Sequence, residues 1–188
     1  FMRIRLAELQ KTDPQAELRQ QWVAYGRISI HLKRAVVAAE DDRFLDHAGF
    51  DWEGIERALE RNAERGRITA GGSTISQQLA KNLFLSSSRS WLRKGQEAAI
   101  TLMIEATWDK RRILEVYLNV AEWGDGVFGA EAAARHYYGR PASPLGPAEA
   151  ARLAVMLPNP RRYEKDYSPR LAAHAARVQR RMTNSQVP

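Results

Sequence analysis

The sequence predicts an all-α protein organised as a single domain over residues 1–188. Apolar residues recur at intervals of three and four along most of the chain, which is the period of an amphipathic helix. Residues that favour helix N-caps precede these apolar stripes, and glycine or proline follows them. No stretch alternates apolar and polar residues as a half-buried strand would. A chain of 188 residues is long enough to enclose one hydrophobic core.

The first half of the chain contains four predicted helices. The first begins at Asp13-Pro14 and ends at Tyr25, because a capping aspartate followed by proline is a common helix start. The other three begin after the capping residues Ser29, Asp51 and Ser73. Their predicted buried stripes are, in order, Leu32, Ala35, Val36 and Ala39; Ile55, Ala58 and Leu59; and Ile75, Leu79 and Leu83.

Further helices follow a predicted loop at Ser86-Ser87-Ser88. They begin at or after Arg89, Asp109, Gly129, Pro147 and Ser168. Buried stripes are predicted on three of them: Ala99, Leu102, Met103 and Ala106; Ile113, Val116, Tyr117 and Val120; and Leu171, Ala175, Val178 and Met182. Glycines at 124, 126 and 129 predict a turn before the alanine-rich helix, which ends before Gly139.

The most distinctive stretch is a glycine-led helix start, Gly71-Gly72-Ser73-Thr74-Ile75-Ser76-Gln77-Gln78-Leu79-Ala80-Lys81-Asn82. The glycines allow a tight turn, and the free N–H groups of the first helical turn favour an anion such as pyrophosphate. Ser73, Gln77 and Lys81 follow at intervals of four and share one helical face. The same pattern also fits a simple loop and cap, and the residues alone leave both interpretations open. The stretch matches neither a Walker loop nor a dinucleotide fingerprint.

Glu40 continues the apolar stripe of the helix that Ser29 caps. Either the register differs, or this carboxylate is held in a cleft, where partial burial raises its pKa and makes it a better base near neutral pH. The neighbouring Asp41 and Asp42 are predicted to be solvated. His47 is predicted to be structural, and no pair of histidines has the spacing of a metal site.

A second cluster combines basic and acidic residues. Arg89, Arg93 and Glu97 share one helical face, although Arg93 and Glu97 also have the spacing of an ordinary surface ion pair. Together with Lys81, the two arginines would form a cationic pocket suited to phosphate oxygens.

The net charge of +7 indicates an anionic partner: nucleic acid, an anionic membrane surface or a phosphorylated substrate. No motif resembles a groove-reading helix, so a module that binds nucleic acid is disfavoured. The absence of cysteine excludes disulfides and thiolate metal sites and leaves the compartment open. No apolar run approaches the roughly 20 residues of a membrane span. The opening Phe1-Met2 leads us to expect an excerpt of a longer protein.

Four ordered motifs resemble those of glycosyltransferase family 51, the peptidoglycan glycosyltransferases. They are Glu-Asp-x-x-Phe-x-x-His-x-Gly at 40–49, the glycine-led stretch at 71–82, Arg-Lys-x-x-Glu at 93–97 and Lys-Arg-Arg-Ile-Leu-Glu-Val-Tyr-Leu-Asn at 110–119. The alanine-rich block ending at Tyr138 is similar to a fifth motif, whose second aromatic is more often Phe. The resemblance covers Ala24 to Tyr163.

The resemblance implies a lysozyme-like helical domain. With no further domain after Pro188, the chain looks like a monofunctional member, whose one N-terminal transmembrane helix is expected to precede Phe1. The implied location is the bacterial cytoplasmic (inner) membrane, with the catalytic domain on the periplasmic face. The implied partners are lipid II, the growing glycan strand, the membrane surface and the cell-wall synthesis machinery, and no nucleic acid.

The implied reaction polymerises lipid II into β-1,4-linked glycan strands and releases undecaprenyl pyrophosphate. Glu40 is the predicted general base for the acceptor hydroxyl. The leaving pyrophosphate needs neutralisation of its charge, a role that suits Lys81, Arg89 and Arg93. The remaining predicted substrate-binding residues are Ser73, Gln77, Gln78 and Asn82.

Glu97 is the second predicted catalytic residue. By analogy with the paired carboxylates of glycoside hydrolysis it could be an acid, but the leaving group hardly requires one. The preferred roles are orienting Arg93 or holding a divalent ion against the pyrophosphate. No prosthetic group and no resident metal are expected, although Mg²⁺ or Mn²⁺ can accompany the pyrophosphate. The alternative function is a lysozyme-like hydrolase or lytic transglycosylase that cleaves finished glycan, which would need no site for pyrophosphate.

Overall fold

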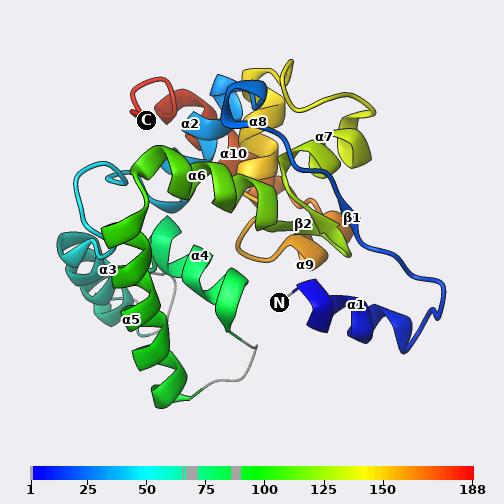
Figure 1. The fold of residues 1–188 in the computed structure, drawn as a ribbon. Helices are drawn as coiled ribbons and strands as arrows, with labels where there is room; N and C mark the ends of the chain where they lie inside the picture. Colours follow the sequence, from blue (N-terminus) through cyan, green and yellow to red (C-terminus); the bar gives the residue numbers. More distant parts are fainter. Residues whose placement is uncertain (1, 65, 67–71, 86–89) are drawn as a thin grey trace.

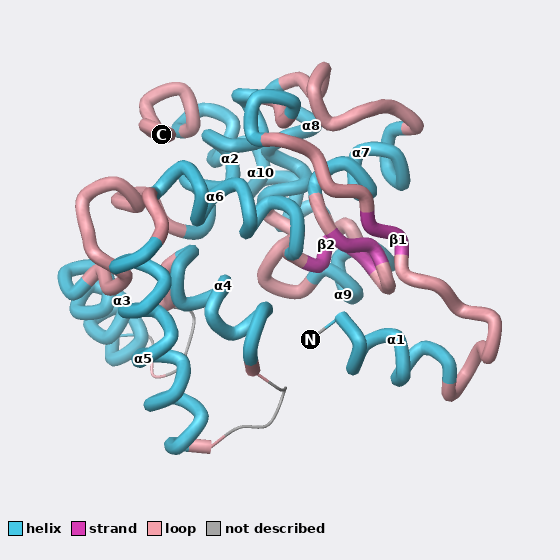
Figure 2. The backbone as a smooth tube through the Cα atoms, viewed as in Figure 1, coloured by secondary structure: helices cyan, strands magenta, loops and turns pink. Residues whose placement is uncertain are grey.

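The computed structural model describes residues 2–64, 66, 72–85 and 90–188, and this part of the chain is mainly helical, as predicted (Figure 1). The helices are α1 (Met2–Gln10), α2 (Ile30–Glu40), α3 (Trp52–Glu64), α4 (Ile75–Phe84), α5 (Trp91–Thr107), α6 (Lys110–Val120), α7 (Ala130–Tyr138), α8 (Pro147–Ala154), α9 (Pro160–Lys165) and α10 (Pro169–Arg181). A 3₁₀ turn, Tyr25–Arg27, precedes α2. Strands β1 (Arg19–Gln20), β2 (Glu122–Gly124) and β3 (Val127–Phe128) form one small sheet among the helices (Figure 2).

The core is built around α2, which packs on α8 and α10. The side chain of Ser29 caps α2 as predicted, because its Oγ accepts the N–H of His31 at 3.2 Å. The stripes predicted on α6 and α10 are buried in full, and that of α2 is buried except for the half-buried Ala39. Burial of these stripes removes apolar surface from water and is the main force holding the helices together.

The predicted helix from Asp13-Pro14 to Tyr25 is wrong. Asp13 instead accepts the N–H of Gln15 at 3.0 Å in a local turn, and Arg19–Gln20 pairs in parallel with Val127–Phe128. The expectation of no strand is wrong for the same reason. Strands this short show no alternation, and the partner of β1 lies in the other half of the chain, so local patterns could not reveal it.

The glycine-rich turn between α6 and α7 is confirmed as an antiparallel hairpin of β2 and β3. Gly129 ends it with φ +84°, and a Cβ there would lie 2.6 Å from the carbonyl oxygen of Asn119. Only glycine fits that position. Buried Arg5 of α1 binds this hairpin through ion pairs to Glu122 at 3.2 Å and Asp125 at 2.8 Å.

Helices α3, α4 and α5 form a second region, in which α4 packs on both α5 and α6 (Figure 1). Asp51 caps α3 as predicted, since its Oδ1 accepts the N–H of Gly54 at 2.9 Å. The predicted cap of α4 is wrong by one residue: Thr74, not Ser73, caps it. The predicted loop at 86–88 and the predicted helix start at Arg89 lie outside the described residues.

The burial predicted for α3 and α5 is partly wrong. Ala58 is buried, but Leu59 is 65% exposed. On α5 the predicted stripe is exposed, with Leu102 at 56% and Met103 at 66%, whereas Glu97 is buried. Helix α5 therefore buries Glu97, Thr101 and Ile104 and leaves its predicted apolar stripe exposed.

The sequence prediction missed α1 and α9. Helix α1 buries only Arg5, and α9 buries no residue. Neither has the apolar stripe on which helix prediction relies. Among the described residues, no helix is both long enough and apolar enough to cross a membrane.

Candidate active site

Glu40 is the last residue of α2, at the point where the buried stripe of that helix ends. It lines a cavity of about 240 Å³ between the end of α2, helix α3 and the start of α4. Ser73 lines the same cavity, together with Arg57 and Arg61 of α3. The carboxylate is half-buried, as expected for a group held in a cleft.

The pKa of Glu40 is raised to about 6, chiefly by burial and also by the negative charge of Asp41. A hydrogen bond from Gln78 and the positive charge of Lys81 act in the opposite direction. A carboxyl group with this pKa is mostly ionised at neutral pH and is still a useful base.

A hydrogen-bonded chain from α6 through α4 holds the Glu40 carboxylate. The Nε2–H of Gln78 donates to Glu40 Oε2 at 2.8 Å, and the hydroxyl of Tyr117 donates to Gln78 Oε1 at 2.8 Å. A hydroxyl that donates to the amide oxygen requires the amide NH₂ to face Glu40. Burial, with the charges of Glu40 and Asp41, raises the pKa of Tyr117 well above 10, so the hydroxyl remains a donor.

Asp41 is buried rather than solvated, which corrects the prediction. Its Oδ2 accepts the N–H of Ile75, the first residue of α4, at 3.0 Å, and its Oδ1 lies 2.9 Å from His47 Nε2. Asp41 therefore supplies the negative charge at the positive end of α4, where pyrophosphate was expected. His47 has the structural role predicted for it, since its Nδ1 also accepts the N–H of Gly49.

Gln77 belongs to the cap of α4 rather than to an open binding face. Its Oε1 accepts the N–H of Thr74 at 3.0 Å, and the Thr74 hydroxyl accepts the N–H of Gln77 at 3.2 Å. The side chain is 5% exposed. We therefore leave Gln77 out of the candidate substrate-binding residues.

Lys81 and Asn82 are the other residues of α4 that the sequence predicted to bind substrate. Lys81 is exposed, and its charge acts on the Glu40 carboxyl. Within the described ranges Lys81 makes no ion pair, which leaves its ammonium group open to a ligand. Asn82 is half-buried next to it. The predicted roles of Gly71 and Arg89 fall on residues outside the described ranges.

Arg93 and Glu97 lie together on the inward face of α5. A guanidinium nitrogen of Arg93 lies 3.9 Å from Glu97 Oε2, and Lys94 contacts Glu97 Oε1. Glu97 is 4% exposed, so its carboxylate is enclosed with two cations. Among the residues that the structure describes, no three His, Cys, Asp or Glu side chains gather as a metal site.

Three residues around Glu40 escaped the sequence analysis as site residues. Arg57 and Arg61 line the cavity, and their spacing of four on one helix was a signal that could have found them. Tyr117 was predicted only as a core residue. Its partner Gln78 is 39 positions away in the chain, and no local pattern indicates such a contact.

Comparison with known proteins decides the family. The sequence profile named Transglycosylase matches residues 6–184 of the chain. The chain belongs to the transglycosylase family. This confirms the resemblance to glycosyltransferase family 51, and the protein is an enzyme that transfers glycosyl groups. The mainly helical architecture agrees with the lysozyme-like domain that this resemblance implies.

Members of the transglycosylase family with high similarity come from several bacteria. The chain is 72% identical over its full length to the biosynthetic peptidoglycan transglycosylase of Azoarcus sp. (strain BH72), covering 81% of that protein. It is 71% identical to the protein of the same name from Aromatoleum aromaticum, covering 82% of it. The corresponding protein of Dechloromonas aromatica is 62% identical, with 82% covered.

Proposed function

We propose that this transglycosylase polymerises lipid II into β-1,4-linked glycan strands, with Glu40 as the general base. The observation that carries the proposal is the half-buried Glu40 carboxylate, whose pKa is raised to about 6 and whose orientation is set by Gln78. The names of the relatives, all biosynthetic peptidoglycan transglycosylases, support peptidoglycan as the product.

In the proposed reaction the acceptor is the 4-hydroxyl of the incoming lipid II. Glu40 takes the hydroxyl proton while the oxygen attacks the anomeric carbon of the growing strand. The bond from that carbon to the pyrophosphate breaks, and undecaprenyl pyrophosphate leaves with the electron pair. A single displacement inverts the α-linked donor to a β linkage.

The leaving pyrophosphate needs positive charge more than a proton. Lys81 is suited to this role, because it is exposed and its charge acts on the Glu40 carboxyl. Arg93 is a second such cation, and its neighbour Glu97 is suited to orient its guanidinium. Arg89 remains in the proposed set from its sequence position. Ser73 and Asn82 remain as proposed hydrogen-bonding residues.

A divalent ion, if it takes part, enters with the pyrophosphate. Glu97 does not fit as its ligand, because its carboxylate is buried and already contacts Lys94 and Arg93. No step of the proposed mechanism passes through a metal.

The outward face of the α3–α5 region is suited to a membrane surface, where a lipid-linked substrate is found. Large apolar side chains are exposed along these helices: Trp52, Leu59, Phe84, Trp91, Leu92, Leu102 and Met103. Exposed tryptophan and leucine next to basic residues are typical of interfacial membrane binding. We propose that this face lies on the outer surface of the bacterial cytoplasmic membrane, where other wall-building proteins would be its neighbours.

Incubation of the purified protein with lipid II tests the proposal. The expected products are long glycan strands, which a β-1,4-specific glycan hydrolase degrades, and free undecaprenyl pyrophosphate. Glu40→Gln should form no strands, whereas Glu60→Gln, on the exposed side of α3, should match the unmodified protein. Shortening of finished glycan without use of lipid II would instead support the lysozyme-like alternative.

Parallel reactions with Mg²⁺, with Mn²⁺ and with a chelator measure the metal requirement separately. If strand synthesis is lost only in the reaction that contains the chelator, the reaction requires a divalent ion.

A further inference from the structure

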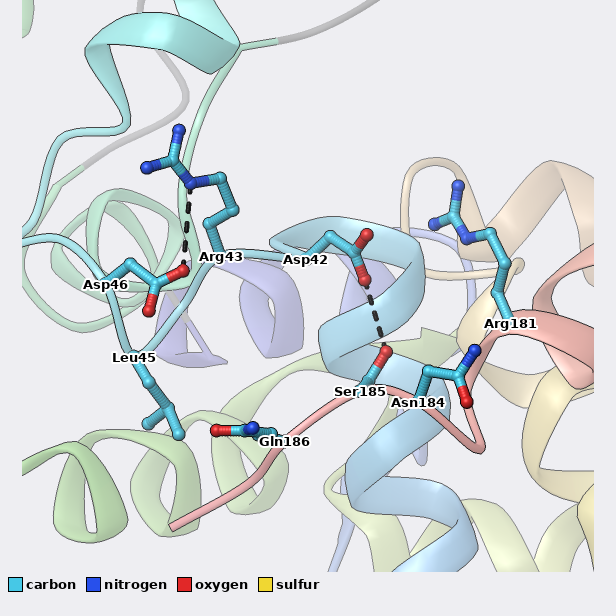
Figure 3. A pocket seen from close by; sticks show the side chains of 8 residues that line it. All are labelled: Asp42, Arg43, Leu45, Asp46, Arg181, Asn184, Ser185 and Gln186. Carbon is cyan, nitrogen blue, oxygen red and sulfur yellow. Dashed lines mark hydrogen bonds and ion pairs between the residues drawn. The ribbon is translucent and has the colours of Figure 1, made fainter.

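A second polar cavity, of about 360 Å³, is lined by the residues shown in Figure 3. It shares Asp42 with the cavity that Glu40 lines. One wall is formed by residues 42–46, which follow α2, and the other by residues at and after the end of α10. Leu45 is the only apolar side chain in the lining given by the described residues. This size is typical of a ligand site, and the lining suits a hydrogen-bonding, charged ligand.

Two contacts connect the two cavities. Asp42 lines both of them. The guanidinium of Arg181 lines the second cavity and donates to the carbonyl oxygen of Ala38, which lines the first. The two cavities therefore share part of their wall.

The charges around the second cavity are not all neutralised. Arg43 is surrounded by the carboxylates of Asp46, Asp51 and Glu53. Asp42, by contrast, accepts a hydrogen bond only from the Ser185 hydroxyl, at 3.2 Å, and has no cationic partner in the described ranges.

Arg181 is open in the same way. It has no carboxylate partner among the described residues, and its guanidinium donates a hydrogen bond to the Ala38 carbonyl oxygen. The cavity thus presents one unpaired negative group and one unpaired positive group.

We propose that this cavity binds the peptide of the acceptor lipid II. The peptide of lipid II carries carboxylates and a side-chain amine on the sugar next to the reacting one. Arg181 would bind a carboxylate and Asp42 the amine, with the side-chain amides of Asn184 and Gln186 available to peptide groups. This assignment rests on the proposed function. The acceptor is chosen over the donor because Asp42 is shared with the cavity that Glu40, the proposed base for the acceptor hydroxyl, also lines.

The test compares two substrates: lipid II with its complete peptide, and the same lipid-linked disaccharide with the peptide removed. The measurement is the KM for each in steady-state strand synthesis, using the full chain. Wild-type protein should show a KM about a hundredfold lower for the peptide-bearing substrate, about tenfold for each of the two charge-assisted hydrogen bonds. Arg181→Ala and Asp42→Asn should each reduce this difference about tenfold by raising only the KM of the peptide-bearing substrate.

Arg180→Ala is the matched control, because Arg180 is exposed on the same helix and is not in the lining. The melting temperature of each variant separates a binding effect from loss of the contact with Ala38. Equal KM values for both substrates in wild-type protein would overturn the assignment, as would variants that raise both KM values equally. Failure of wild-type protein to polymerise either substrate would overturn the proposed function itself, and this assignment with it.

Discussion

Helices α5 and α6 follow each other in the chain and both pack on α4, yet only α6 buries its predicted apolar stripe. That stripe includes Ile113 and Tyr117. Helix α5 exposes its predicted stripe and buries Glu97, Thr101 and Ile104 instead. An apolar stripe in the sequence therefore shows which side of a helix is apolar, but it does not show whether other elements of the protein cover that side.

This difference fits the proposal that the outward face of the α3–α5 region lies on a membrane surface. The α2–α6–α8–α10 part is held by apolar burial and supplies Glu40 and Tyr117 from fixed positions. In the α3–α5 part, Leu59, Leu102 and Met103 are exposed, although Ile75 and Leu79 of α4 join the core. A helix that lies on a membrane surface needs an exposed apolar face.

The largest expected effect is the loss of activity on removal of the base. Glu40→Gln should lower the rate of strand synthesis by about 10²–10⁴-fold, the usual contribution of a general base. Initial rates with lipid II measure it. A rate within threefold of wild type would show that the polar side of the site does not include the base.

Alanine substitutions in the apolar stripes of α6 and α5 should lower the free energy of unfolding by clearly different amounts. Ile113→Ala, at a fully buried position, should lower the free energy of unfolding by about 2–5 kcal/mol. Leu102→Ala on α5 should change it by no more than about 0.5 kcal/mol, because the side chain is 56% exposed. Denaturant unfolding measures both, and similar losses at the two positions would break the comparison.

The raised pKa of Glu40 also has a consequence for stability. Because burial raises this pKa from 4.5 to about 6, the ionised carboxylate is less favourable in the folded state than in the unfolded state. The contribution of the protonated Glu40 carboxyl to the free energy of unfolding is fully present below pH 4.5, and it is lost as the pH rises through about 6. Glu40→Gln should thus be more stable than wild type by up to about 2 kcal/mol at pH 7, and the gain should vanish at pH 4.

The outward face of α5 should matter for membrane binding rather than for folding. The double variant Leu102→Ser, Met103→Ser should weaken binding to anionic phospholipid vesicles by about tenfold, because it removes apolar area that would enter the interface. Co-sedimentation with vesicles at high salt measures this apolar part. Gln96→Ser, an exposed polar position on the same helix, is the control. Unchanged binding by the double variant would remove this face from the proposed membrane contact.

The smallest expected effect tests the link between the two regions, the hydrogen bond from Tyr117 on α6 to Gln78 on α4. Tyr117→Phe keeps the packing but frees the Gln78 amide, at an expected cost of about 1 kcal/mol, or about fivefold in kcat. Because the Gln78 bond lowers the pKa of Glu40, its loosening should move the acidic limb of the pH–rate profile to higher pH.

Tyr138→Phe is the matched control for that measurement, since its hydroxyl donates to the carbonyl of Glu149 away from the site. In wild-type protein kcat/KM should fall as the pH drops below about 6, where Glu40 takes up a proton. A Tyr117→Phe profile that coincides with wild type would show that the hydroxyl does not position the base.

Much of the fold was predictable because helix caps and stripes are local. Ser29 and Asp109 accept N–H groups two or three residues ahead, and such contacts can be read from the sequence alone. The family was likewise readable from ordered motifs. The partial burial expected at Glu40 followed from its place at the end of a buried stripe.

Other features depended on residues distant in the chain. Asp41 stands next to Glu40, but its buried place follows from the approach of Ile75 and His47. The parallel pairing of β1 with β3 replaced a helix that local signals favoured. The free energies of such contacts come from partners that only the folded chain brings together.

The sequence by itself therefore determined where most helices run, which family the chain resembles and that Glu40 sits at a buried helix end. Only the tertiary structure decided that Tyr117 and Gln78 hold that carboxylate, that Asp41 occupies the start of α4, and that α5 leaves its predicted apolar stripe exposed. The physical reason is the distance along the chain over which each kind of interaction acts. Backbone caps and helical periodicity act within a few residues, whereas the surroundings of a side chain are set by every element that packs against it.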